Sequence, residues 1–401
     1  MRVFRVALML APLLLALPAM PAHDDNMVQW DVACANTEPT SPTLTTVNTK
    51  LLSSTPGELA ISGDMLIVSR WSSGGFQIYS LATPTNPTLL GTIGTSGTTL
   101  DMKASADGQT VFVGTTGRIH LVNIANPSSP SFIRTVILPI GNLDQGHMLY
   151  DAVINGNEYL FDATQSGSGV YIFQVTGTPT NRNLVQVAQF APGSPLAAHD
   201  TYVQHDPVLA KPILYVANGV AGWIAADVSN PALPLPMAIV PNPDLGQGYV
   251  HSIQAQWVNG RRLVTTIEEL GGNILRVWDA TILSAPVLVA EWSTQTPLGV
   301  VPSASSQHNL QIVDGRLYMA HYRCGFWIFD LRTLPTLPIF TAIQPVAHYA
   351  PQVSNGQHWD VVLRNGYIYT SDMRMSSGTA AVYTVQYSGI TAGDPAYTST
   401  G

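Results

Sequence analysis

The stretch QHNLQIVDGRLYMAHYRCGFWIFDLRTLPTLPIFTAI, residues 307–343, contains one complete structural unit of the chain. An apolar segment leads through an Asp314-Gly315 turn to a second one, then through a glycine-containing loop to a third, and finally to a segment bounded by prolines. Short segments rich in β-branched and aromatic residues, separated by Gly, Pro, Asn and Asp, are typical of β-strands joined by tight turns. The unit is therefore predicted to be a sheet of four antiparallel strands.

The same order of segments occurs seven times along the chain. Other copies are MLIVSRWSSGGFQIYS from Met65, ILYVANGVAGWIAADVSNP from Ile213 and YIYTSDMRMSSGTAAVYTVQY from Tyr367. Four short strands repeated at intervals of roughly 50 residues describe the blades of a β-propeller. A two-sheet sandwich does not explain a sevenfold repeat, so we predict an all-β, seven-bladed β-propeller of four-stranded blades.

The ring of blades needs a closing strand. The segment SPTLTTVNTKLL, beginning at Ser41, resembles the fourth strand of a blade, and the chain ends soon after the third strand of the last blade at Tyr383. The N-terminal strand is therefore expected to complete the last blade, which removes two exposed sheet edges. Residues 23–401 then form a single propeller domain.

Composition agrees with this fold and excludes others. The 401 residues include 33 glycines and 29 prolines, a density that breaks or weakens long helices and argues against a bundle or a doubly wound α/β fold. Hydrophobic residues make up 46% of the chain, which is enough for a large core and argues against disorder.

The first 22 residues are predicted to be a secretory signal peptide. Arg2 and Arg5 precede the apolar run VALMLAPLLLAL, and the small residues PAMPA follow at residues 18–22. Without this segment, 15 basic residues stand against 25 acidic ones, so a phosphate backbone would be repelled and we expect no nucleic-acid partner. No later apolar run is long enough to span a membrane. We therefore expect a secreted or periplasmic protein.

The sequence also resembles a known family. The phrases ILYVANGVAGWIAADVSNP and RLYMAHYRCGFWIFDL are similar to the repeats of the LVIVD-repeat proteins, which are exported bacterial β-propellers. The resemblance covers nearly the whole mature chain and implies the fold and the exported location. It implies little about activity, because most members of that family have no assigned reaction.

Five histidines open the first strand of successive blades, and they are the candidate metal ligands: His147, His199, His251, His308 and His358. First strands are innermost in a propeller, so equivalent positions converge around the central axis. Neutral imidazole is a ligand for Cu, Zn, Fe and Ni alike, and the pattern therefore predicts an axial transition-metal ion. The alternative is a structural ring of histidines that orders water or caps strand ends.

Loops between the second and third strands must lie on the same face as these histidines. Candidate catalytic residues in the blade 6 loop are His321, Tyr322, as a general acid, and Arg323, which suits an anionic group. The other polar residues on this face are Arg70, Trp71, Glu268, Glu269, Asp372 and Arg374. Asp200 and Asp360, which lie near the histidines in sequence, could orient imidazoles or simply be structural.

The chain has two cysteines, Cys34 and Cys324. In an exported protein a pair of cysteines predicts a disulfide. The alternative is that Cys324 is a metal ligand.

Two functions fit these features. The first is a metalloenzyme, an oxidoreductase or a lyase, that acts on a small anionic or polar substrate. Axial histidines on a propeller are similar in architecture to the metal sites of methanethiol oxidases and oligogalacturonate lyases, although the motifs of those families are not matched. The second is a non-catalytic module that presents one face to a protein or a surface and uses the histidines structurally.

Overall fold

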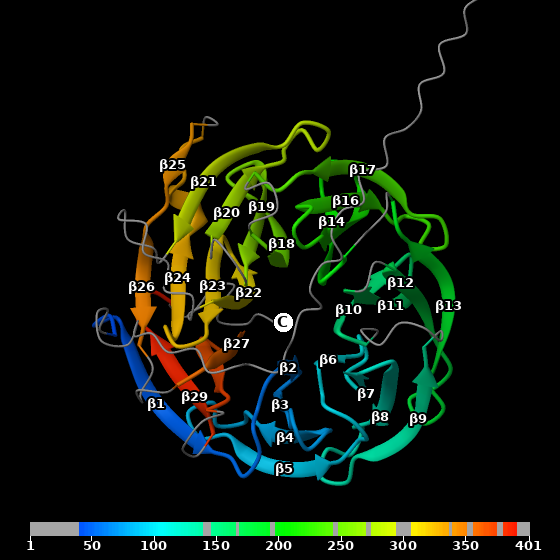
Figure 1. Ribbon diagram of the computed structural model, residues 1–401. Helices are drawn as coiled ribbons and strands as arrows, with labels where there is room; N and C mark the ends of the chain where they lie inside the picture. The colour runs from blue at the N-terminus through cyan, green and yellow to red at the C-terminus, as the bar shows by residue number, and fades with distance from the viewer. Residues whose placement is uncertain are drawn as a thin grey trace, which may run out of the picture.

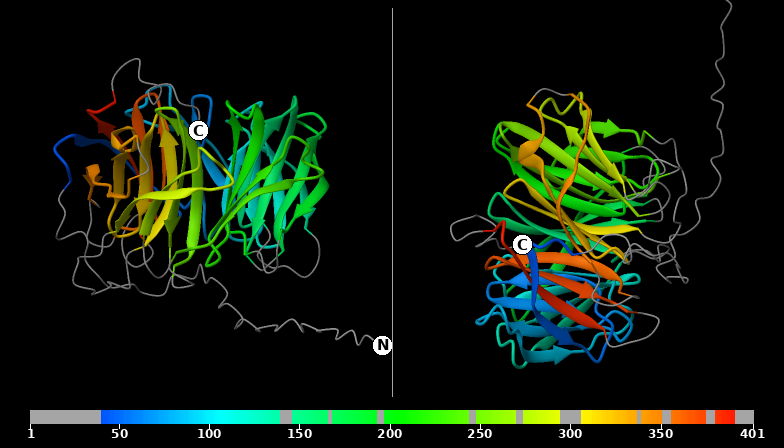
Figure 2. Two further views of the ribbon diagram at one scale, coloured as in Figure 1. Left: turned by 90° about the horizontal axis from the view of Figure 1, so that it is seen from above. Right: turned by 90° about the vertical axis from the view of Figure 1, so that its left-hand side faces the viewer.

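A computed structural model describes residues 40–138, 146–165, 168–192, 197–243, 248–269, 274–293, 306–336, 339–350, 356–374 and 380–390. These residues form seven antiparallel sheets arranged as blades around a central axis (Figure 1). Seen from the side, the ring is a thick disc (Figure 2). The predicted seven-bladed β-propeller is confirmed.

Each blade begins with a strand beside the axis, and the next strand pairs with it on the outer side. The innermost strands are β2 (Leu59–Ser62), β6 (Asp101–Ala104), β10 (Met148–Ile154), β14 (Asp200–Asp206), β18 (Val250–Val258), β22 (Gln307–Val313) and β27 (His358–Arg364). The second strands are β3 (Met65–Ser69), β7 (Thr110–Thr115), β11 (Asn157–Thr164), β15 (Lys211–Ala217), β19 (Arg261–Glu268), β23 (Arg316–His321) and β28 (Tyr367–Asp372).

The outer half of each blade has the same order. The third strands are β4 (Phe76–Ser80), β8 (Arg118–Asn123), β12 (Gly169–Thr176), β16 (Trp223–Asp227), β20 (Ile274–Asp279), β24 (Phe326–Asp330) and β29 (Ala381–Tyr387). The outermost strands are β5 (Thr88–Ile93), β9 (Ser131–Ile137), β13 (Asn183–Phe190), β17 (Leu235–Val240), β21 (Val287–Ser293), β26 (Pro345–Tyr349) and β1 (Leu44–Leu51).

The N-terminal strand β1 closes the ring. It pairs antiparallel with β29, from Leu44 opposite Tyr387 to Leu51 opposite Ala381, and the two strands lie side by side in Figure 1. This is the predicted closure, and it gives the last blade its fourth strand from the other end of the described chain.

Blade 6 departs from the sequence prediction at its outer edge. The proline-bounded segment IFTAI was expected to be the fourth strand, but that strand is β26, which begins at Pro345. Instead, Thr341–Ala342 (β25) pairs in parallel with β21 as a fifth strand of blade 5. The segment thus covers the outer edge of the neighbouring sheet, where unpaired backbone groups would otherwise face solvent.

Seven clusters of buried apolar residues each fill the space between two neighbouring blades. An eighth, smaller cluster consists of Trp71, Tyr322, Trp359 and Met373. Trp278 packs between blades 4 and 5, and Trp327 packs between blades 5 and 6. The one helical element among the described residues is the single turn η1 (Leu331–Thr333), and no helix there is long and apolar enough to span a membrane.

Candidate metal centre

Four of the five candidate histidines form a continuous layer on the axis. The ring centroids are 4.7 Å apart between His147 and His199, 3.9 Å between His199 and His251, and 4.4 Å between His251 and His308. All four rings are buried, with at most 7% of each residue exposed. Each of these histidines lies at the start of an innermost strand, either just before it or at its second residue. This shared position brings together residues that are about 50 positions apart in the chain.

His358 does not belong to this layer. Its imidazole lies between the blades, near the rings of Tyr349 and Tyr383, and its Nδ1 is 2.9 Å from Thr370 Oγ1. Trp359 instead continues the layer, with its ring centroid 3.7 Å from that of His308. The prediction that five histidines converge on the axis is therefore correct for four of them and wrong for His358.

A one-residue difference in register explains the displacement of His358. In blade 6, Gln307 pairs with His321 before a β-bulge, whereas in blade 7, His358 pairs with Asp372 before the corresponding bulge. The counterpart of His358 is therefore Gln307, and the counterpart of His308 is Trp359. Bulges re-aim the side chains that they contain. Both blades contain a Gln-His pair, at residues 307–308 and 357–358, but the two pairs differ by one residue in register.

Backbone hydrogen bonds set the orientation of two imidazoles. His199 Nδ1 lies 3.0 Å from the carbonyl oxygen of His251, and His308 Nδ1 lies 3.0 Å from that of Trp359. A carbonyl only accepts, so Nδ1 carries the hydrogen and the lone pair of each neutral ring is on Nε2. In His199, this Nε2 lies 3.1 Å from Nε2 of His147. Two imidazole nitrogens in this arrangement can share a proton or a cation.

Glu269 adds a carboxylate to the layer. It follows β19, and its Oε2 lies 3.6 Å from Nε2 of His251. One ligand atom from each of His199, His251 and Glu269 can be chosen so that all three lie within 4.8 Å of one another, and all three residues are buried. Atoms bound to one ion at about 2.1 Å lie at most about 4.2 Å apart, so the group needs only a small contraction to hold a metal.

Tyr322 and Trp71 show that the loops between second and third strands do lie against the histidine layer. The Tyr322 hydroxyl donates a hydrogen bond of 2.5 Å to Oε1 of Glu269, and its ring centroid is 5.2 Å from that of His308. Trp71 packs on Trp359 with a centroid distance of 4.6 Å. A donor to a candidate ligand carboxylate is typical of the groups that orient metal ligands.

The remaining loop candidates have other surroundings. His321 ends β23 and is fully buried, and this burial lowers the pKa of its imidazole to about 3, so the ring is neutral. Arg323 is partly exposed in the turn that follows. Glu268 is held in a buried ion pair with Arg276.

Asp372 and Arg374 pair with each other, with 2.9 Å between Asp372 Oδ2 and Arg374 Nε. Their ion pair lies beside Tyr383, which also contacts the ring of His358. The two residues therefore belong to the surroundings of His358 in blade 7.

Asp200 and Asp360 bind backbone rather than imidazole in the described contacts. Asp200 accepts hydrogen bonds from the backbone N–H of Thr201, at 2.7 Å, and more weakly from that of Ile253, at 3.4 Å. Asp360 accepts from Leu59 in the next blade at 2.8 Å. Both carboxylates therefore connect neighbouring blades. This agrees with a structural role for them and not with the orientation of an imidazole.

Cys324 is fully buried in the turn between β23 and β24 of blade 6. Cys34 lies outside the described residues, so the disulfide stays a prediction. Peptide mapping without reduction should recover the two cysteine-containing peptides joined, as expected for an exported protein with one cysteine pair. Alkylation of both thiols in the native, unreduced protein would contradict the pairing.

Comparisons with known proteins identify the architecture alone. No family model matches the chain, and no curated protein matches it. Among solved structures, the WD40 repeats of RRP9 are similar with a TM-score of 0.59 at 12% identity, over 87% of this chain and 98% of that one. Sqt1 of Saccharomyces cerevisiae is similar with a TM-score of 0.54 at 9% identity, over 83% of each chain. At these identities the likeness shows the propeller fold.

Proposed function

We propose that this propeller binds one transition-metal ion at the axial layer through His147, His199, His251 and Glu269. The observation that carries the proposal is the convergence of imidazole nitrogens and a carboxylate from blades 3, 4 and 5 in a buried layer. Mixed imidazole and carboxylate ligation suits Zn²⁺ or Fe²⁺. The carboxylate thus narrows the choice of metals that the histidines alone had left open.

We further propose that the metal serves a reaction, either an oxidation or a lyase step on a small anionic or polar substrate. A bound ion would supply Lewis acidity at the layer. Tyr322 would hold Glu269 in place through its hydroxyl and could exchange a proton with that carboxylate. The partly exposed Arg323 in the adjacent turn would attract the anionic group.

The metal proposal is tested on protein produced without a histidine tag. Elemental analysis should find about one ion per chain, because the ligands belong to a single layer. Glu269→Gln and His199→Asn should each lose most of the metal, whereas His358→Gln, which changes a buried histidine outside the layer, should retain it. A metal-free wild-type protein, or wild-type metal content in both ligand variants, would exclude the site.

A second measurement does not depend on how the variants fold. Removing the metal from wild-type protein with a chelator should lower its stability, by about 2.7 kcal/mol if the free ion is present at about 100 times its Kd. Thermal unfolding with and without the ion measures this difference. An unchanged transition would show that the layer is held together without a metal.

The alternative function is a non-catalytic interaction scaffold. The WD40-type architecture of the similar structures supports it at the level of fold. A metal-free protein that recovers a partner by affinity capture, and loses that partner on Arg323→Glu, would favour the scaffold.

We also propose that the protein is exported and belongs with the LVIVD-repeat propellers. Support for both comes from the sequence: the charged, apolar and small-residue order of residues 1–22, and the repeat phrases at residues 213–231 and 316–331. N-terminal sequencing of protein recovered outside the cytoplasm should begin at or near residue 23. An intact N-terminus in the cytoplasmic fraction would contradict export.

A further inference from the structure

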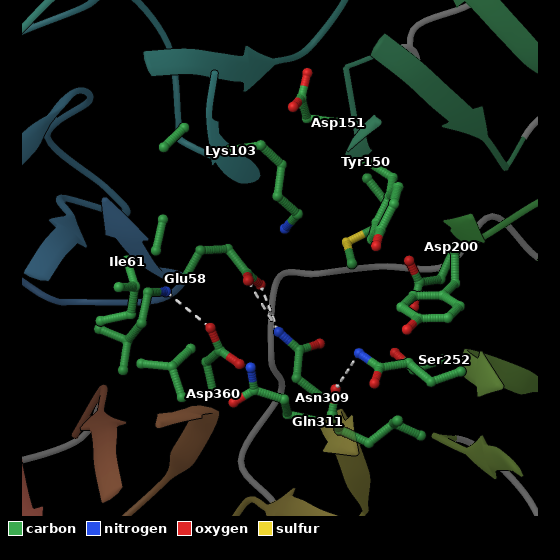
Figure 3. A pocket seen from close by; sticks show the side chains of 18 of the residues that line it. Glu58, Ile61, Lys103, Tyr150, Asp151, Asp200, Ser252, Asn309, Gln311 and Asp360 are labelled. Atoms are coloured by element: carbon green, nitrogen blue, oxygen red, sulfur yellow. Dashed lines mark hydrogen bonds between the residues drawn. The ribbon is translucent and has the colours of Figure 1, made fainter. Parts of the chain in front are cut away.

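A second candidate site lies in a cavity on the central axis. The cavity measures about 480 Å³ and is lined by residues from the innermost strands of all seven blades (Figure 3). The four layer histidines are not among its lining residues, so the cavity and the candidate metal centre occupy different positions along the axis. A volume of this size accommodates a small organic molecule.

Acidic groups outnumber basic ones in the cavity wall. Glu58, Asp200 and Asp360 line it at nearly equivalent positions of blades 1, 4 and 7, together with a single cation, Lys103. Lys103 is already paired with Asp101, with 2.8 Å between Nζ and Oδ1. Burial raises the pKa of Glu58 and of Asp360, which favours their neutral forms in the empty cavity. A bound cation would favour their ionised forms, so the wall suits a cation better than an anion.

The cavity also presents an acceptor that lacks a donor. The side-chain amide nitrogen of Asn309 donates to both carboxylate oxygens of Glu58, at 3.0 and 2.9 Å. Its Oδ1 has no hydrogen-bond partner among the described residues, although Asn309 is only 7% exposed. In Figure 3 the Asn309 side chain extends into the ring of lining residues, with its amide nitrogen toward Glu58 and its oxygen on the side away from Glu58. A buried acceptor without a donor costs free energy, which a ligand N–H would recover.

Two aromatic rings form part of the same wall. Tyr150 and Tyr202 come from neighbouring blades, and their ring centroids are 5.2 Å apart in an edge-to-face arrangement. Burial raises the pKa of Tyr202 to about 12, so its hydroxyl stays neutral. Aromatic faces beside carboxylates attract ammonium groups and pack against the carbon chain that carries them.

We propose that this cavity binds a small organic cation, an amine whose ammonium group contacts Glu58, Asp200 and Asp360 and whose carbon skeleton packs on Tyr150 and Tyr202. A single metal ion would leave most of the volume empty, and an anion would meet the carboxylates. The site is independent of the proposed metal centre.

The test is isothermal titration calorimetry of the full chain with two matched pairs of probes. Putrescine and glucosamine carry ammonium groups, and butanediol and glucose are their neutral analogues. We expect at least one amine to bind at about one per chain, and its neutral analogue to bind at least about tenfold more weakly. Failure of both amines to bind, or equal binding of the neutral analogues, would overturn the proposal.

Variants of opposite sign make the test sharper. Asp200→Asn should weaken amine binding about tenfold or more, whereas Lys103→Met should strengthen it by removing a like charge. Asp314→Asn is the matched control, because it makes the same charge change outside the cavity at a position whose positive φ asparagine tolerates. If Asp314→Asn weakens amine binding as much as Asp200→Asn does, the loss of affinity comes from the net charge of the protein. The cavity is then not the binding site.

Discussion

At the scale of single residues, the environment of a histidine decides its chemistry. His199 lies on the axis with its Nδ1 donating to a backbone carbonyl, so its Nε2 lone pair faces a second imidazole. His358 also opens an innermost strand, but its ring lies between two blades beside Tyr349 and Tyr383. The sequence predicted that both were at the start of a blade. The sequence could not distinguish the two histidines, because a shift of one residue along the strand moves a side chain from the axis to the space between blades.

His358 should make stability depend on pH. Burial lowers the pKa of its imidazole to about 4, below the usual value of about 6.5. Between these values the unfolded chain binds a proton that the folded chain does not, so stability falls as pH decreases through this window. The destabilisation caused by His358→Gln at about pH 7.5 should shrink by about 2 kcal/mol at about pH 5. Urea unfolding of both proteins measures it, and an unchanged difference would mean that His358 protonates freely in the folded state.

At the scale of elements, tight turns and bulges position the strands. Four of the turns that join the first and second strands of a blade contain two successive residues with positive φ: Asn155-Gly156, Asn259-Gly260, Asp314-Gly315 and Asn365-Gly366. This is the type I′ turn that suits the twist of a hairpin, and its Asn-Gly or Asp-Gly signature was readable in the sequence. The bulges at the starts of β18, β22 and β27 left no comparable signature.

Gly156→Ala isolates the backbone contribution of one such turn. Gly156 has a φ of +77°, and an added Cβ would meet no atom within 4 Å, so strain in the left-handed region is the main cost. We expect a loss of about 1–2 kcal/mol in the free energy of unfolding. Gly94→Ala is the control, since Gly94 has an ordinary φ and an added Cβ there meets a single side-chain atom, at 3.9 Å. Equal effects of the two substitutions would contradict the assignment of the loss to backbone strain.

At the scale of the whole molecule, the ring is closed by pairing of strands from opposite ends of the described chain. Leu44 of β1 packs into the core cluster between blades 6 and 7, together with Tyr383 and Tyr387 of β29. Without β1, the backbone edge of β29 and part of this cluster would face solvent. Closure therefore contributes both hydrogen bonds and apolar burial.

Truncation should reveal how much the ring depends on this closure. A chain that begins at Leu52 lacks β1 and should unfold at a lower temperature and aggregate through the exposed edge of β29. A chain that begins at Thr40 keeps β1 and is the matched control. Differential scanning calorimetry and light scattering compare the two, and identical transitions would show that closure by β1 adds no stability.

The sequence by itself determined the seven-bladed propeller, the closing strand and the residues that begin each blade. These features follow from local patterns, namely apolar strands and turn residues repeated at a regular interval. Only the tertiary structure decided which side chains meet on the axis: Trp359 in place of His358, Glu269 beside His251, and the acidic cavity around Asn309. The physical reason is that such contacts join blades far apart in the chain. They depend on bulges of a single residue, which a repeat pattern does not record.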